Sequence, residues 1–262
     1  MNWKCWIGIF LVGIGCSQPV QEEAEAYMLP DPVGFSLGQR ALVAQALAFP
    51  LPILFPGTYH GDEVPARAYQ RAWLGLFQEG DRFELVPTKL LQQQVEDPLL
   101  DAPGMQTGWE IQAERPGTCL FLVSPSTGVR PGEVQYWIHP NSSLLPGDSL
   151  RFSFHEQEYL WYATGNREAM LLAEPMSLDY SFWWCVVSNE GKRCTPLWHI
   201  ESMDDQSPSL LFVGDLDRDG FLDVVVNEAA HYNVFAPALW LSGGLSGPEA
   251  LRKLGGMTAV GC

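Results

Sequence analysis

Short runs in which apolar and polar residues alternate recur along the chain beyond residue 70, separated by proline and glycine. In DRFELVP, Phe83 and Leu85 alternate with Arg82 and Glu84, as a half-buried strand requires. Further segments continue the series of short strands: RAYQRAWLGLF, GWEIQAE, TCLFLVSP, VQYWIHP, LRFSFHEQEYLWYATG, YSFWWCVV and TPLWHIE. Many short strands with closely spaced turns favour antiparallel sheets. We therefore predict a mostly β fold, an antiparallel sandwich or barrel-like sheets, and not a parallel α/β fold.

One segment has a helical pattern instead. In SLGQRALVAQALAFP, Ser36 and Gln39 are spaced as a capping box, and the pattern stops before Pro50. We expect little helix elsewhere. The chain shows no clean internal boundary, so we treat 31–262 as a single mostly β domain.

Composition and charge narrow the range of partners. The 262 residues are 47% hydrophobic, which is enough for one large or two small cores and excludes a disordered chain. The formal net charge is −16, and no run of Lys and Arg occurs. Because nucleic acids and anionic lipid headgroups reward clustered positive charge, both are poor candidate partners.

The N-terminus has the pattern of an export signal. One Lys precedes the apolar stretch CWIGIFLVGI, which is too short to span a bilayer but has the length of a signal-peptide core. The following Gly13-Ile14-Gly15-Cys16 resembles the lipobox of bacterial lipoproteins, although Gly13 stands where that family usually has Leu. The resemblance implies that 1–15 is removed and that Cys16 is acylated. An ordinary secretory signal with a chance cysteine is the alternative.

The segment after Cys16 predicts a tether and a location. Residues 16–30 include SQPVQEEAEA, which lacks apolar periodicity, so we expect a flexible acidic linker. Ser17 after the lipid cysteine resembles sorting to the Gram-negative outer membrane. The Gln21-Glu22-Glu23 run faintly resembles surface-export signals. A lipid anchor at Cys16 would make the membrane a partner, with the domain either periplasmic or surface-exposed.

Exported chains can keep disulfides, so the remaining cysteines matter. In WWCVVSNEGKRCTPLW, two apolar runs flank a Ser-Asn-Glu-Gly turn and read as a hairpin. A four-residue turn, Ser188 to Gly191, places Cys185 directly opposite Cys194, where a disulfide is feasible. A three-residue turn would shift the register and leave two buried thiols. Cys119 with Cys262 is a second possible pair.

The segment GDLDRDGFLDVVV crowds like charges at short spacing. Calcium prefers six to eight oxygen ligands at about 2.3–2.6 Å from a tightly curled loop. Positions 1, 3 and 5 of such a loop are Asp215, Asp217 and Asp219, and Gly220 permits the turn. The Phe221 carbonyl at position 7 and Asp223 at position 9 complete the predicted Ca²⁺ site. An EF-hand is excluded, because Val226 replaces its bidentate Glu and strands replace its helices.

The spacing D-x-D-x-D-G-x-x-D resembles the calcium loops of FG-GAP repeats, known from the β-propellers of integrin α-subunits and from bacterial surface proteins. The resemblance covers 208–242 and includes the strand APALWLSGG. A propeller needs several blades, and the sequence has no second aspartate cluster. We therefore expect one FG-GAP-like unit, a strand–calcium loop–strand near the C-terminus, inside another β architecture.

Two other features suggest alternative functions. GTYHGDEV places His60, Asp62 and Glu63 in one turn, and His231 follows the strand after the calcium loop. Brought together, they would supply a general base and its orienting group, or a transition-metal site, in an envelope hydrolase. Exposed tryptophans would instead suit a carbohydrate-binding surface protein, and the adjacent Trp183 and Trp184 must face opposite sides of a strand. Our main interpretation is a calcium-stabilised envelope lipoprotein that acts as a binding or structural module for a protein or glycan.

Overall fold

The computed structural model describes residues 51–137, 143–167, 179–188, 191–201, 208–243 and 251–260. The signal peptide, the tether and the helix predicted after Ser36 lie outside these residues. Within them the chain is all β, with two short 3-10 turns and no α-helix, as the alternating pattern predicted. None of the helical segments in this part of the chain is long and apolar enough to cross a membrane.

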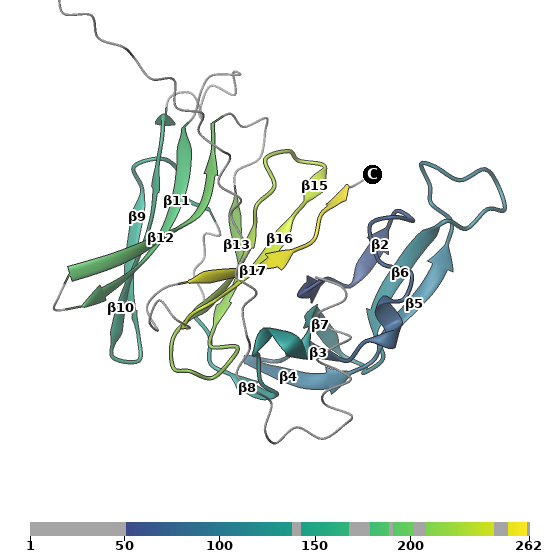
Figure 1. The fold of residues 1–262 in the computed structure, drawn as a ribbon, viewed down its shortest axis with the longest axis horizontal. Coiled ribbons are helices and arrows are strands. Elements are labelled where there is room, and N and C mark those ends of the chain that lie inside the picture. The colour runs from purple at the N-terminus through teal and green to yellow at the C-terminus, as the bar shows by residue number, and fades with distance from the viewer. Residues whose placement is uncertain are drawn as a thin grey trace, which may run out of the picture.

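The strands form five antiparallel sheets (Figure 1). In chain order the strands are β1 (Ile53–Leu54), β2 (Gly57–Tyr59), β3 (Trp73–Glu79), β4 (Arg82–Thr88), β5 (Leu90–Val95), β6 (Gly108–Ala113), β7 (Thr118–Val123), β8 (Gly132–Val134), β9 (Ser149–Phe154), β10 (Gln157–Thr164), β11 (Tyr180–Ser188), β12 (Gly191–Ile200), β13 (Ser209–Gly214), β14 (Asp223–Asn227), β15 (Val234–Phe235), β16 (Pro237–Leu241), β17 (Arg252–Gly256) and β18 (Ala259–Val260). The 3-10 turns are Ala68–Gln70 and Pro125–Thr127.

The first sheet has the order β1-β7-β3-β4-β8, and a separate sheet β2-β6-β5 follows it in space. Strands β3 and β4 form a hairpin in which Glu79 pairs with Arg82, so the turn contains only Gly80 and Asp81. Gly80 has φ 60°, a left-handed conformation that suits glycine in such a turn. Along β4, Phe83 and Leu85 are buried, whereas Arg82 and Glu84 are exposed. The predicted half-buried strand is confirmed.

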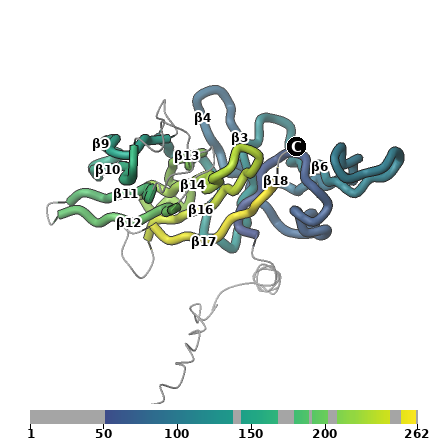
Figure 2. Tube along the Cα trace, turned by 90° about the horizontal axis from the view of Figure 1, so that it is seen from above, coloured from purple at the N-terminus to yellow at the C-terminus, as the bar shows by residue number. Residues whose placement is uncertain are grey.

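The sheet β12-β11-β10-β9 is a simple meander, and the sheet β13-β14-β16-β17 lies beside it (Figures 1 and 2). Strand β15 leaves the second of these sheets and pairs with β18. A core between the two sheets contains Trp161, Trp184 and Phe182 from the meander and Val224 and Val226 from β14. This pair of sheets therefore packs as a sandwich.

The β13-β14-β16-β17 sheet is covered on its other face as well. Val225 and Leu239 belong to a second core, which they share with Leu76, Leu85 and Phe121 of the first sheet. Every residue of β14 is buried for this reason. A strand that is covered on both faces has apolar residues at successive positions, and apolar and polar residues do not alternate along it. This explains the three valines that follow the aspartate loop.

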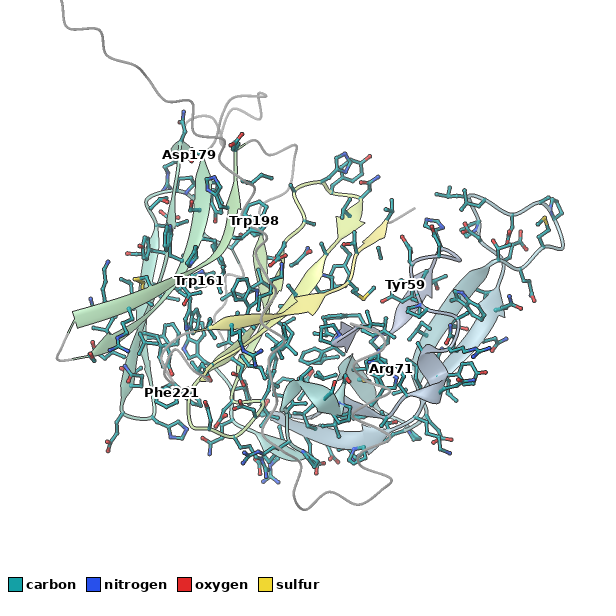
Figure 3. All side chains as sticks on the ribbon, viewed as in Figure 1. Tyr59, Arg71, Trp161, Asp179, Trp198 and Phe221 are labelled. Atoms are coloured by element: carbon teal, nitrogen blue, oxygen red, sulfur yellow. A yellow bond between two sulfur atoms is a disulfide. The ribbon has the colours of Figure 1, made fainter. Side chains whose placement is uncertain are left out.

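A third core joins the first sheet to β2-β6-β5 and to the C-terminal strand. Ile111 from β6, Trp73 from β3 and Ala259 from β18 meet in it. The three cores follow one another from the meander to the β5–β6 end (Figure 3). The aspartate loop leaves β13 between the first two of them, which brings it close to three sheets.

Candidate metal centre

The aspartate loop runs from Asp215 to Leu222 and connects β13 to β14. Hydrogen bonds between its backbone and its own carboxylates curl it tightly. The N–H groups of Asp219 and Gly220 each donate to the Asp215 carboxylate at 3.0 Å. Arg218 has φ 63° and Gly220 has φ 91°, so the left-handed turn predicted at the glycine is present and begins two residues earlier.

Three of the predicted ligands lie together. One carboxylate oxygen each from Asp215, Asp217 and Asp223 forms a group whose members are all within 4.8 Å of one another. Asp223 is 0% exposed and Asp215 is 8% exposed. Within the described ranges no Lys or Arg forms an ion pair with this group.

The electrostatics of the group favour a positive charge. Burial raises the pKa of Asp217 to about 6, and the charge of Asp219 adds to the shift. Burial also raises the pKa of Asp215, and it raises the pKa of Asp223 well above its usual range, with Asp217 contributing. Buried carboxylates without a counter-charge are costly, so either protons or a cation must offset them.

Asp219 lies apart from this group of three. Its Oδ1 accepts the Phe221 N–H at 2.9 Å and lies 3.1 Å from the Ser242 hydroxyl, and its Oδ2 lies 3.2 Å from that hydroxyl. Four of the five predicted ligands are carboxylates of this loop. Only three of them, those of Asp215, Asp217 and Asp223, lie close enough to one another to bind a single ion. The Phe221 carbonyl stays a prediction.

The structure adds Ser242, at the end of β16, to the site. Its backbone N–H and its hydroxyl both lie within hydrogen-bonding distance of Asp223 Oδ1, at 2.7 and 3.0 Å. The hydroxyl has one proton but faces oxygens of two carboxylates. The short spacing of the aspartates gives no indication of Ser242. This residue is 19 positions after Asp223 and follows β14, β15 and β16 in the chain.

Neighbouring sheets hold the loop from outside. The Leu222 N–H donates to the buried Tyr159 hydroxyl of β10 at 3.2 Å. On the other side, Asp215 N–H donates to the Gln135 carbonyl at 2.8 Å, and Arg130 N–H donates to the Leu216 carbonyl at 3.1 Å. An open cavity beside the loop is lined by residues that include Asp215 and Asp219, so one member of the group of three borders a solvent-accessible space.

The donor chemistry fits a hard divalent cation. All side-chain donors in the group are carboxylate oxygens, and the loop contains no imidazole or thiolate. Such oxygen sets suit Ca²⁺ and Mg²⁺ and suit Zn²⁺ or Cu²⁺ poorly.

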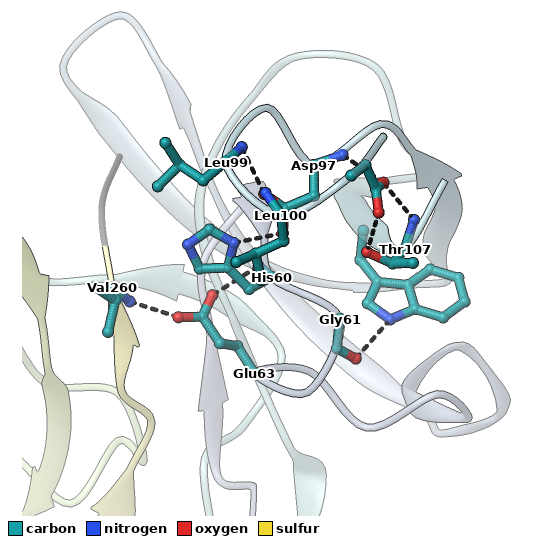
Figure 4. A network of polar contacts seen from close by, with 10 residues as sticks. His60, Gly61, Glu63, Asp97, Leu99, Leu100, Thr107 and Val260 are labelled. Atoms are coloured by element: carbon teal, nitrogen blue, oxygen red, sulfur yellow. Dashed lines mark hydrogen bonds and ion pairs between the residues drawn. The ribbon is translucent and has the colours of Figure 1, made fainter. Parts of the chain in front are cut away.

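The second predicted cluster lies in a different part of the fold (Figure 4). The His60 backbone N–H donates to Glu63, and His60 Nδ1 lies 2.5 Å from Asp97 Oδ2. Asp62 is exposed. Asp97, which follows β5, was missed because it is 37 positions away in the sequence.

His231 follows β14, and its ring contacts that of Tyr232 at 4.6 Å. Among the described residues the aspartate group alone meets the geometry for three metal ligands, so His60, Asp62, Glu63 and His231 form no such set.

The disulfide prediction is confirmed. Cys185 pairs directly with Cys194 across β11 and β12, Ser188 pairs with Gly191, and the two sulfurs are bonded. Cys119 donates its thiol to the Phe121 carbonyl, while Cys262 lies outside the described residues, so their pairing stays untested.

The tryptophan pair also divides as the alternation requires. Trp184 is buried in the core, whereas Trp183 lies on the outer face, where its ring is parallel to that of Tyr162. The pairing of Tyr162 with Trp183 in the strand register accounts for this contact without a ligand.

Comparison with protein-family models, with curated proteins and with solved structures finds no match to this chain.

Proposed function

We propose that the chain is a calcium-stabilised lipoprotein of the Gram-negative outer membrane and that it acts as a binding or structural module. The observation that carries the proposal is the close group of Asp215, Asp217 and Asp223, two of them buried, to which no Lys or Arg of the described residues forms an ion pair. The D-x-D-x-D-G-x-x-D spacing supports Ca²⁺ as the ion, since a curled loop of carboxylates and one carbonyl supplies the larger, adaptable shell that calcium takes. Magnesium requires a stricter octahedron and retains water.

The ion would act as a staple between sheets. Three parts of the fold meet at the loop through hydrogen bonds: β10 through Tyr159, the 130–135 segment, and the end of β16 through Ser242. Calcium held by the loop reverses the repulsion among the carboxylates and fixes these contacts. At a calcium concentration 100 times the dissociation constant, binding adds about 2.7 kcal/mol to the free energy of unfolding.

The envelope location is supported by two features. The Gly13-Ile14-Gly15-Cys16 motif predicts the lipid anchor, and the Cys185–Cys194 disulfide is typical of an oxidising compartment. Replacing Cys16 with Ser should release the protein from the membrane fraction. Unchanged membrane association, together with no acyl group on the wild type, contradicts the anchor.

Thermal unfolding tests the staple. Calcium should raise the melting temperature of the wild type at matched ionic strength, and magnesium should raise it less. The matching matters because monovalent salt also screens carboxylate repulsion. In Asp217→Asn the calcium-dependent increment should fall sharply, whereas Asp62→Asn, at an exposed aspartate outside the loop, should keep it. Equal increments in all three proteins contradict the site.

A further inference from the structure

The connection between β5 and β6 carries an apolar tip. This β5–β6 loop, residues 96–107, projects beyond the body of the molecule (Figures 1 and 2). Leu99 is 62% exposed, Leu100 is 70% exposed and Met105 is 50% exposed. A single exposed apolar side chain is common on protein surfaces and needs no explanation. Three large ones within seven residues form a group, and such groups mark interaction sites.

Two of the three acidic residues of the loop are bonded within the molecule, whereas Glu96, directly after β5, is exposed. Asp97 is 1% exposed, and its Oδ1 accepts the N–H groups of Leu99 and Leu100 while its Oδ2 contacts His60. Asp101 is the only charged residue from 98 to 107, and its carboxylate accepts the Asp97 N–H, the Thr107 N–H and the Thr107 hydroxyl. Residues 98–107 therefore carry no charged group except the internally bonded Asp101, and the exposed charge of Glu96 lies at the base of the loop.

The backbone of the loop is largely satisfied from within. Residues 97–107 include two prolines, which leaves nine N–H groups, and six of these donate inside the loop: those of Asp97, Leu99, Leu100, Asp101, Met105 and Thr107. Unsatisfied N–H groups are the main obstacle to moving a loop out of water into an apolar medium. A loop that already pairs most of them loses less when it enters the membrane interface than a loop whose N–H groups all point to water.

The base of the loop is fixed to the body. His60 joins Asp97 to the turn after β2, and Glu63 in that turn accepts the N–H groups of His60 and Val260, which ties the turn to β18 (Figure 4). The Trp109 indole donates to the Gly61 carbonyl at 3.1 Å. These contacts fix the base of the loop, so less ordering is needed when the tip meets a surface.

We propose that the β5–β6 loop is a membrane-contacting loop that places Leu99, Leu100 and Met105 in the interface of a zwitterionic bilayer. A convex tip with paired backbone groups fits lipid better than it fits a polar protein surface, and the net charge of −16 disfavours an anionic leaflet. The lipid anchor of the proposed function is the reason a bilayer is near. The contacts that shape the loop are its own and involve no residue of the aspartate group.

Oxidation of Met105 by hydrogen peroxide, measured by peptide mass analysis, reports whether lipid covers the tip. In phosphatidylcholine vesicles, Met105 of the full chain should oxidise roughly tenfold more slowly than in the Leu99→Asp/Leu100→Asp double variant. Leu211→Asp, at an exposed leucine on β13, is the matched control and should keep the slow rate. The full-length Cys16→Ser chain without lipid should oxidise fast at Met105.

Three results overturn the proposal. The first is an equal rate of Met105 oxidation in the wild type and the double variant in vesicles. The second is slow Met105 oxidation in the Cys16→Ser chain without lipid. The third is protection of Met105 in native envelopes but not in vesicles of pure lipid. The last result assigns the tip to a protein partner. The mass of Cys16 in the same samples tests the anchor separately, because an unacylated chain whose Met105 is still protected by added vesicles contradicts the anchor and keeps the loop.

Discussion

Ser242 directs both its backbone N–H and its hydroxyl at one oxygen of Asp223, at 2.7 and 3.0 Å. Asp223 is completely buried, so these contacts replace the water that its carboxylate loses on folding. The pair ties the residue after β16 to the start of β14, directly after the aspartate loop.

Ser242→Ala should lower the free energy of unfolding by about 1–2 kcal/mol, because it removes the hydroxyl from two carboxylates. The loss should persist with calcium bound, since the backbone N–H cannot replace the hydroxyl at Asp219. Urea unfolding measures it, with Ser153→Ala at an exposed position of β9 as control. A loss no larger than that of the control contradicts the role of Ser242.

Tyr159→Phe should destabilise the protein by about 1–3 kcal/mol, because it leaves the buried Leu222 N–H without its acceptor. Tyr162→Phe removes a hydroxyl from the outer face of the same strand and should change stability little. Chemical unfolding of the two variants side by side makes the comparison. If both cost the same, the link between β10 and the aspartate loop does not stabilise the fold.

The disulfide should contribute about 2–3 kcal/mol, as expected for a closed loop of this length. Cys194→Ala should lower the free energy of unfolding, measured in urea, by that amount. A reducing agent should bring the wild type to the level of the variant and leave the variant unchanged. A wild type that is indifferent to reduction would show that the bridge adds nothing to stability.

The contact between His60 and Asp97 should make stability depend on pH. Its hydrogen bond to Asp97 raises the pKa of His60 above 6.5, so this contribution is complete below that pH and is lost as the pH rises through the higher folded value. The same bond lowers the pKa of Asp97 below 3.8, so its contribution is present above 3.8 and is lost on further acidification. The window of maximum benefit therefore runs from about pH 4 to about pH 6.5.

Thermal unfolding of Asp97→Asn at two pH values measures this window. The variant should lose more melting temperature relative to the wild type at pH 5.5 than at pH 9. The amide oxygen of the Asn can still accept the N–H groups of Leu99 and Leu100, and any change in those two bonds is the same at both pH values and cancels in the comparison. Equal deficits at the two pH values would mean that His60 is uncharged throughout.

The features that the sequence predicted are those encoded by short spacing. The aspartate loop and the hairpin of Cys185 and Cys194 each depend on residues fewer than ten positions apart, so strand and turn geometry alone place them together. The alternation of Phe83 and Leu85 likewise fixes which face of β4 is buried.

The features that it missed depend on how the sheets stack. Tyr159 is 63 positions from Leu222, and Asp97 is 37 positions from His60. Only the order in which the β9–β12 and β13–β17 sheets pack brings the first pair together, and no local pattern encodes that order. Ser242 is 19 positions from Asp223 and reaches it because β16 pairs with β14.

Titration calorimetry of calcium into the purified protein tests the central claim most directly. The wild type should bind one Ca²⁺ per chain, with a dissociation constant no weaker than about 10⁻³ M, the weak end of the range for extracellular modules. Asp217→Asn, which removes one carboxylate from the group of three, should bind at least tenfold more weakly, and Asp62→Asn should bind as the wild type does. No heat of binding to the wild type up to several times that concentration, with a melting temperature unchanged by chelation, would contradict a calcium site at Asp215, Asp217 and Asp223.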